Sequence, residues 1–235
     1  MLKRTVLGIT VWVLVGTAYA QKRKHWHGFN PKKMYSMDST TKDGYTVVFV
    51  NNDPTFDTRQ KQRMIETFYK VYPQECKIYN PEARNKVVIF IDTAYKDVAA
   101  TGNGLIRVNP EWMKKNPEDL DVVTHEAMHV VQGYQRYEPI WITEGIADYV
   151  RATLGINNEA SKWKLPDYNS SQNYTDSYRI TARFFIWLES KKEKGIIKKL
   201  DNAMRTNTYT DDFWKNETGK TVDELWEEYG KLPTL

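Results

Sequence analysis

The pentapeptide His125-Glu-Ala-Met-His129 constrains the fold of this chain more than any other feature. Its two histidines stand four positions apart, and a helix places such residues one turn apart on the same face. On that face both imidazoles can bind one metal ion, with Glu126 beside them. The flanking residues are apolar, at positions 122, 123, 130 and 131. The sequence therefore predicts a buried helix that carries a metal-binding face.

A catalytic zinc ion usually has three protein ligands and an open position for water. The chain has four histidines, at 25, 27, 125 and 129, so no histidine downstream of the motif can be the third ligand. This excludes the long metzincin pattern, since position 135 is a glutamine. The candidates are Glu144 and Asp148, four apart on one face of a predicted helix. We assign Glu144 as the ligand and Asp148 as the acceptor of a free ring N–H from a liganding histidine. The exchanged assignment, in which Asp148 is the ligand, stays open.

The hydrophobic pattern places strands first and helices after them. Alternating or continuous apolar residues predict strands at 45–50, 86–91 and 105–108. This order favours the α+β class, with a small sheet followed by a helical half. Helical spacing and start signals predict helices over 57–72, 116–132, 141–154, 176–194 and 195–205, and a capping box at 221–224 before a last helix.

Residues 1–20 have the parts of a secretory signal peptide. Lys3 and Arg4 precede an apolar stretch at 6–15, and Ala18-Tyr-Ala20 is a typical cleavage site. The apolar stretch is too short to span a bilayer of about 30 Å. We therefore expect a secreted or periplasmic protein with no stable membrane anchor after cleavage.

The remaining chain has an ordinary charge balance. The whole sequence has 34 basic and 30 acidic residues, and removal of Lys3 and Arg4 leaves 32 against 30. Such a balance does not favour nucleic-acid binding. Residues 21–42 are predicted to form a basic, flexible arm, and residues 43–235 one domain. The single cysteine, Cys76, leaves no internal disulfide, so packing must stabilise the domain.

Three stretches are relevant together: Val-Thr-His-Glu-Ala-Met-His-Val-Val-Gln at 123–132, Thr-Glu-Gly-Ile-Ala-Asp-Tyr-Val-Arg at 143–151, and Tyr-Arg-Ile-Thr-Ala-Arg-Phe-Phe-Ile-Trp at 178–187. The second and third contain sequences that are much more particular than the pentapeptide alone. They resemble the basic secretory protein family of plants and bacteria, which are gluzincin-type zinc metallopeptidases. The resemblance covers most of the chain after residue 45. It implies a zincin-like fold, a Zn²⁺ cofactor and a peptide or protein substrate. It also implies the roles of His125 and His129 as ligands, Glu126 as base, Glu144 as third ligand and Asp148 as its support.

The pattern predicts peptide-bond hydrolysis, in which Glu126 takes a proton from the attacking water. The developing oxyanion needs a further donor, for which we favour Tyr178 over Arg179 and Arg183. The predicted strand at 105–108 is expected to be an edge strand that pairs with the extended substrate. Two other functions stay open: a degenerate, non-catalytic zinc-binding protein, against which the intact Glu126 argues, and a zinc hydrolase of non-peptide substrates.

Overall fold

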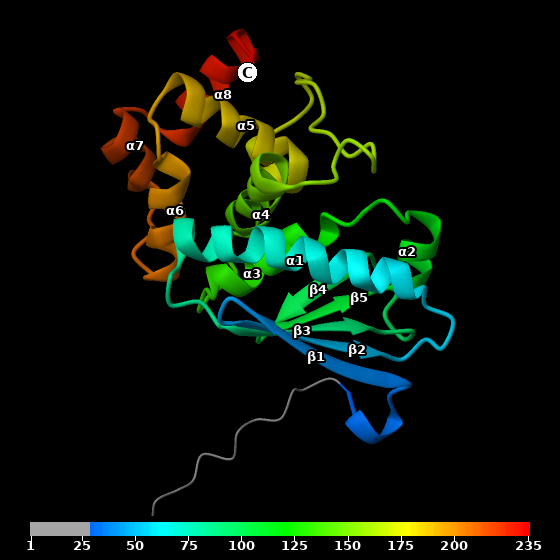
Figure 1. Ribbon diagram of the computed structural model, residues 1–235. Helices are drawn as coiled ribbons and strands as arrows, with labels where there is room; N and C mark the ends of the chain where they lie inside the picture. Colours follow the sequence, from blue (N-terminus) through cyan, green and yellow to red (C-terminus); the bar gives the residue numbers. More distant parts are fainter. Residues whose placement is uncertain (1–28) are drawn as a thin grey trace, which may run out of the picture.

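The structure, a computed structural model, describes residues 29–235. A five-stranded sheet is followed by a helical half (Figure 1). Helices α1 (Thr58–Tyr79) and α3 (Val122–Gln132) pack on one face of the sheet, and α4 (Ile140–Leu154) packs on α3. This is the α+β arrangement expected from the sequence, with a small sheet followed by a helical half. The predicted signal peptide and the first part of the predicted arm lie outside the described residues.

The sheet has the strand order β1-β2-β3-β5-β4. Its three inner strands run parallel to one another, and the two outer strands pair antiparallel with their neighbours. The inner strands are nearly all buried because both faces of the sheet are covered. The strands are β1 (Ser36–Lys42), β2 (Tyr45–Asn51), β3 (Lys86–Ile91), β4 (Ala99–Gly102) and β5 (Leu105–Val108).

The sequence analysis missed both outer strands, and each is joined to its neighbour by a two-residue turn. Asp43-Gly44 links β1 to β2, and Asn103-Gly104 links β4 to β5; all four residues have positive φ. This backbone matches the twist of a hairpin. Two predictions are therefore wrong. Strand β5, at 105–108, is not an edge strand, because β4 folds back along it and forms the edge. The arm predicted at 21–42 is not flexible throughout, because β1 pairs with β2 along its whole length.

Two helix boundaries also differ from the predictions. Helix α1 does not end before Pro73 but continues to Tyr79, since burial of its last turns outweighs the one N–H that proline lacks. The helix predicted at 116–132 begins later, at Val122, because Asn116 ends a separate helix, α2 (Pro110–Lys115), and residues 117–121 form a turn. The remaining helices are η1 (Pro31–Lys33), η2 (Tyr174–Asp176), α5 (Tyr178–Lys191), α6 (Ile196–Arg205), α7 (Asp212–Thr218) and α8 (Val222–Lys231).

Helix α3 is the most deeply placed helix of the domain. All of its residues except His129 are buried. The carboxylate of Asp121, at its start, accepts hydrogen bonds from the Thr124 hydroxyl (2.7 Å) and from the Ile156 N–H (3.0 Å). These bonds satisfy a buried charge and tie the start of α3 to the loop after α4.

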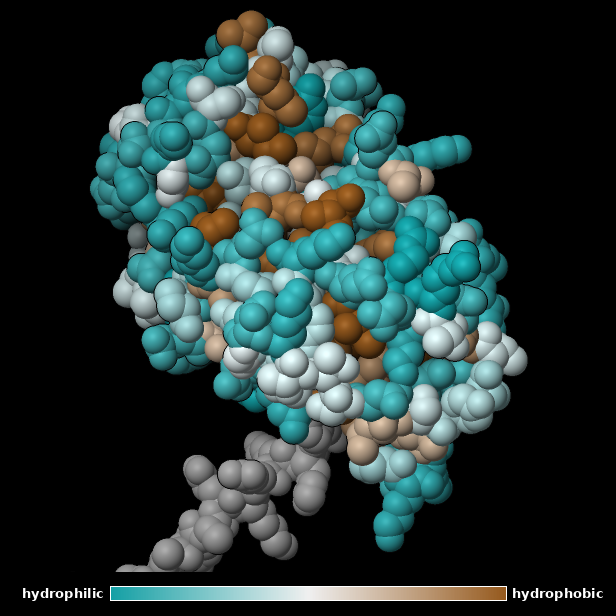
Figure 2. Space-filling model, viewed as in Figure 1, coloured by the Kyte–Doolittle hydropathy of each residue, from teal (hydrophilic) through white to brown (hydrophobic). Residues whose placement is uncertain are grey.

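The surface on the face viewed in Figure 1 is mostly hydrophilic. Hydrophobic residues appear there only as separate patches among hydrophilic ones (Figure 2). In residues 29–235, no helix combines the length and the apolar character needed to cross a membrane.

Glu75 is an unusual charge-bearing residue within the core. It lies on α1, is fully buried, and neither carboxyl oxygen has a hydrogen-bond partner among the described residues. Burial raises the pKa of this carboxyl well above its ordinary value, and the charge of His125 opposes this effect only in part. The protonated, neutral form is therefore the form compatible with the fold.

We predict that Glu75 makes the domain less stable as the pH rises. Above the pKa of the unfolded chain, the folded state holds a proton that the unfolded state has lost, so the free energy of unfolding falls with pH. The slope reaches at most about 1.4 kcal/mol per pH unit for one group. The Glu75→Gln variant lacks this group, and its stability relative to the wild type should increase between pH 5 and pH 8. Urea unfolding of both metal-free proteins at several pH values measures the difference. A constant difference would show that Glu75 titrates alike in both states.

Candidate metal centre

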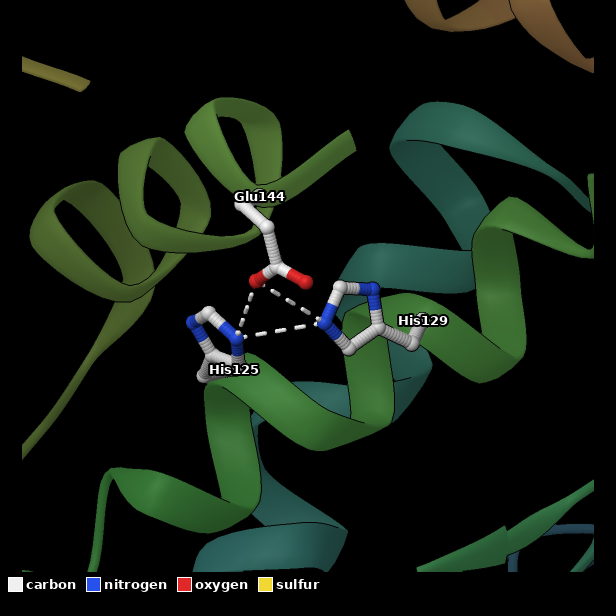
Figure 3. A group of neighbouring side chains, drawn as sticks. All are labelled: His125, His129 and Glu144. Atoms are coloured by element: carbon white, nitrogen blue, oxygen red, sulfur yellow. Dashed lines mark hydrogen bonds and ion pairs between the residues drawn. The ribbon is translucent and has the colours of Figure 1, made fainter. Parts of the chain in front are cut away.

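Three side chains from α3 and α4 converge on one point (Figure 3). The Nε2 atom of His125 lies 3.2 Å from Oε2 of Glu144, and the Nε2 atom of His129 lies 3.5 Å from the same oxygen. The two Nε2 atoms are 3.1 Å apart. Within the part of the chain that the structure describes, this is the one group of three or more histidine, cysteine or acidic side chains placed to hold a metal ion.

These separations match those between ligands of a tetrahedral zinc ion. Zinc bonds of about 2.0–2.1 Å place two tetrahedral ligands about 3.3 Å apart. Two imidazoles and one carboxylate are also a donor set that suits zinc. Oε2 of Glu144 is buried and has no hydrogen-bond partner among the described residues, a position that a metal ion would satisfy. The residues present therefore fit zinc.

The other nitrogen of each imidazole is held by a hydrogen bond. Nδ1 of His125 donates to Oδ1 of Asp148 (2.7 Å), and Nδ1 of His129 donates to Oε1 of Gln132 (2.7 Å). Gln132 in turn donates from Nε2 to the carbonyl oxygen of Thr143 (2.9 Å), next to Glu144. Such bonds fix the ring orientation and leave both Nε2 atoms free for a metal. The structure thus places Asp148 behind His125, on the side away from the three converging atoms.

The charges around this point favour a cation. Burial by itself would lower the pKa of the His125 imidazole, but Asp148 and Glu144 outweigh it and raise that pKa to about 10. For Glu144, burial is opposed by the contacts with the two histidines and by their charges, which lower the pKa of the carboxyl well below its ordinary value. Both shifts favour a positive charge between the three groups, and a divalent metal ion supplies one.

Tyr137 contacts the same carboxylate from the loop between α3 and α4. Its hydroxyl donates to Oε1 of Glu144, and its ring centre lies 5.9 Å from that of His129. Burial, and then the contact with Glu144, raise the pKa of the Tyr137 phenol, so the hydroxyl stays a donor. Because Oε1 is occupied in this way, Glu144 presents its other oxygen to the two histidines.

Glu126 follows the first histidine on α3 and is buried. The Thr101 hydroxyl, on the edge strand β4, lies 2.7 Å from Oε2 of Glu126 and donates to it. The same hydroxyl lies 3.0 Å from the main-chain oxygen of Glu126. The residue predicted to act as the base is therefore held by the strand that borders the site.

Tyr178 stands at the start of α5 on a strained turn. Ser177 has φ 65° and ψ −177°, and Tyr178 has φ 52°. The conformation of Ser177 is nearly restricted to glycine. Holding a residue in such a sparsely populated backbone conformation costs about 1–3 kcal/mol of free energy. The turn places the Tyr178 ring parallel to the His125 ring, with ring centres 6.2 Å apart. Burial, and then the charges of Glu144, Asp148 and Glu126, raise the pKa of the phenol, so it is a hydrogen-bond donor at neutral pH.

The two arginines considered with Tyr178 bond elsewhere. Arg179 donates to the carbonyl oxygen of Lys164 (3.4 Å), and Arg183 donates to that of Pro233 (3.1 Å). Arg183 also lies over the ring of Tyr229. The structure therefore brings Tyr178 to the converging side chains and directs both guanidinium groups to other segments.

Sequence reasoning missed three residues of this site. Gln132 left a signal, because it stands three positions after His129 and so lies on the same side of the helix. Tyr137 is in a loop and Thr101 in a strand that was not predicted, and neither position has a periodic relation to the motif. Only the folded chain brings them to Glu144 and Glu126.

Solved structures of peptidase families have a similar fold. One is a point mutant of a two-domain M1 zinc metallopeptidase bound to L-tryptophan, with TM-score 0.50 and 12% identity; the match covers 85% of this chain and 52% of that one. An M1 zinc metallopeptidase from Deinococcus radiodurans, bound to a Tyr-Ser-Ala substrate, has TM-score 0.51 and 11% identity, with 85% and 53% covered. An aminopeptidase N family protein from Idiomarina loihiensis has TM-score 0.53 and 11% identity, with 82% and 46% covered. The chain spans about half the length of these proteins, and the likeness is one of fold.

At the level of sequence, no curated protein gives a significant match. The model of one family does match, over residues 36–229, and its description is BSP, peptidase of plants and bacteria. The match begins where β1 begins and ends within α8, so it covers the sheet, the converging side chains and the helical half. This chain belongs to the BSP family of peptidases of plants and bacteria.

Proposed function

We propose that this protein is a zinc-dependent peptidase in which His125, His129 and Glu144 hold the metal ion and Glu126 is the general base. The observation that carries the proposal is the separation of the three ligand atoms, 3.1–3.5 Å, with Glu126 on the same helix. The solved zinc metallopeptidases of similar fold, one of them with a bound tripeptide, support it.

When bound, the zinc ion supplies a Lewis acid that lowers the pKa of water and polarises the scissile carbonyl. Glu126 accepts a proton from the attacking water as the new C–O bond forms. The same carboxyl then gives this proton to the leaving nitrogen as the C–N bond breaks. Asp148 and Gln132 keep the orientation of the two imidazole rings fixed during both proton transfers. Tyr178 donates a hydrogen bond to the developing oxyanion.

The substrate backbone binds along β4 in this proposal. This strand pairs with β5 on one side only and contacts α3, which bears the two histidine ligands and the base. An extended peptide can add to such an edge as a further strand. We therefore assign the pairing with the substrate to β4 and not to the strand at 105–108, for which it was predicted from the sequence.

We further propose that the protein is exported. The signal peptide predicted at 1–20 supports a secreted or periplasmic location. The family match and β1 both begin at residue 36, after the proposed signal peptide.

Removal of the metal tests the proposed function. We expect the purified protein to contain a single zinc ion per chain and to hydrolyse a denatured protein substrate. Dipicolinate should abolish this hydrolysis, and added Zn²⁺ should restore it, because in this proposal the zinc ion is the group that lowers the pKa of the attacking water. Isophthalate lacks the ring nitrogen that binds zinc and serves as the matched control. Hydrolysis that survives complete removal of zinc would contradict the proposal.

A further inference from the structure

We propose that Thr101 is a positioning residue for the general base, through a hydroxyl that serves both protonation states of Glu126. This inference rests on the proposed function. Thr101 lies on β4 opposite Ile106 of β5, and its side chain is partly buried against α3. One element therefore borders the substrate path and also holds the base.

The first step of the argument is the contact with the charged carboxylate. The hydroxyl donates to Oε2 of Glu126 at 2.7 Å. Hydrogen bonds to an ionised acceptor are short and roughly twice as strong as neutral ones. The bond fixes the rotation of the carboxylate, so that Oε1 is left for the proton of the attacking water. A glutamate without this contact has several rotamers, and only some of them direct an oxygen to the water.

The second step concerns the state after proton transfer. The water O–H bond has broken, a Glu126 O–H bond has formed, and the carboxyl is neutral and a weaker acceptor. A hydroxyl has one donor and two acceptor sites. The main-chain oxygen of Glu126, at 3.0 Å, is a second acceptor within reach of the Thr101 hydroxyl. When Glu126 is protonated, the Thr101 hydroxyl can turn to this main-chain oxygen, so its O–H still has an acceptor. The hydroxyl returns to Oε2 once the leaving nitrogen has taken the proton.

The experiment compares two substitutions at this position. Thr101→Val keeps the shape and the β-branched character that suits a strand, and it removes only the hydroxyl. Thr101→Ser keeps the hydroxyl. We expect kcat of the valine variant to fall roughly 10- to 100-fold, as for loss of a hydrogen bond to a charged group, with KM and zinc affinity unchanged within about 2-fold. The serine variant should recover most of kcat.

Thr41→Val is the matched control. Thr41 lies on β1, at the opposite edge of the sheet, and its hydroxyl contacts that of Thr46 (2.9 Å). It should leave kcat, KM and zinc affinity unchanged.

The outcomes separate this inference from the proposed function. If wild type hydrolyses the substrate and Glu126→Gln does not, but Thr101→Val has the wild-type kcat, only the inference is overturned. The inference is overturned as well if the Thr101→Ser variant loses as much activity as the Thr101→Val variant. The same holds if Thr101→Val raises KM or releases zinc instead of lowering kcat. If wild type shows no chelator-sensitive hydrolysis, or if Glu126→Gln is fully active, both proposals fail.

Discussion

Glu126→Gln is expected to lower kcat for peptide hydrolysis by at least about 10²-fold while zinc remains bound. Glutamine has the shape of glutamate but cannot accept the proton of the attacking water. The two imidazoles and Glu144 are unchanged, so the metal site should persist, and Thr101 can still donate to the amide oxygen. The measurement is kcat and KM on a fluorogenic peptide, together with elemental analysis of the same sample.

A glutamate on the surface provides the control for this prediction. Glu159 is exposed in the loop after α4, and Glu159→Gln changes the same atoms away from the site. It should retain full activity and full zinc content. Equal activity of the Glu126 variant and the wild type would remove Glu126 as the base. Loss of zinc from that variant would show that Glu126 supports the metal site itself.

The second large effect is expected on metal affinity. Glu144→Ala removes one of three ligand atoms and opens a buried site to water, so zinc affinity should fall by more than about 100-fold. Asp148→Asn removes the charged partner of Nδ1 on His125 but no ligand atom. Its zinc affinity should fall by about 10- to 100-fold, the usual range for a residue that orients a ligand.

Competition with a chromophoric zinc chelator measures both affinities on purified protein. Gln132→Ala is a useful companion, because it removes the corresponding partner of His129 without altering a charge. Full zinc retention by Glu144→Ala, combined with loss by Asp148→Asn, would support the exchanged assignment, in which Asp148 is the ligand. Thermal unfolding of the metal-free variants shows whether each change has also disturbed the fold.

Most of the centre of this domain could be predicted from residue patterns. Two histidines four apart in an apolar segment specify a helix with a polar face, because helical geometry alone relates such positions. The order of strands and helices gave the α+β class for a similar reason: the periodicity of each segment depends on its own residues. The outer strands were missed although Asp43-Gly44 and Asn103-Gly104 are strong turn signals, because short strands with few apolar residues have little periodicity.

Sequence alone determined that a helix near residue 125 presents two imidazoles and a carboxylate, since those relations are local. Only the tertiary structure decided which acid meets the two Nε2 atoms, which groups hold the rings, and which strand borders the base. Glu144, Tyr137 and Thr101 lie on three separate segments, and their distances to α3 are set by how helix packs on helix and on sheet. Such contacts depend on the shapes of many buried side chains at once, so no spacing along the chain could have specified them.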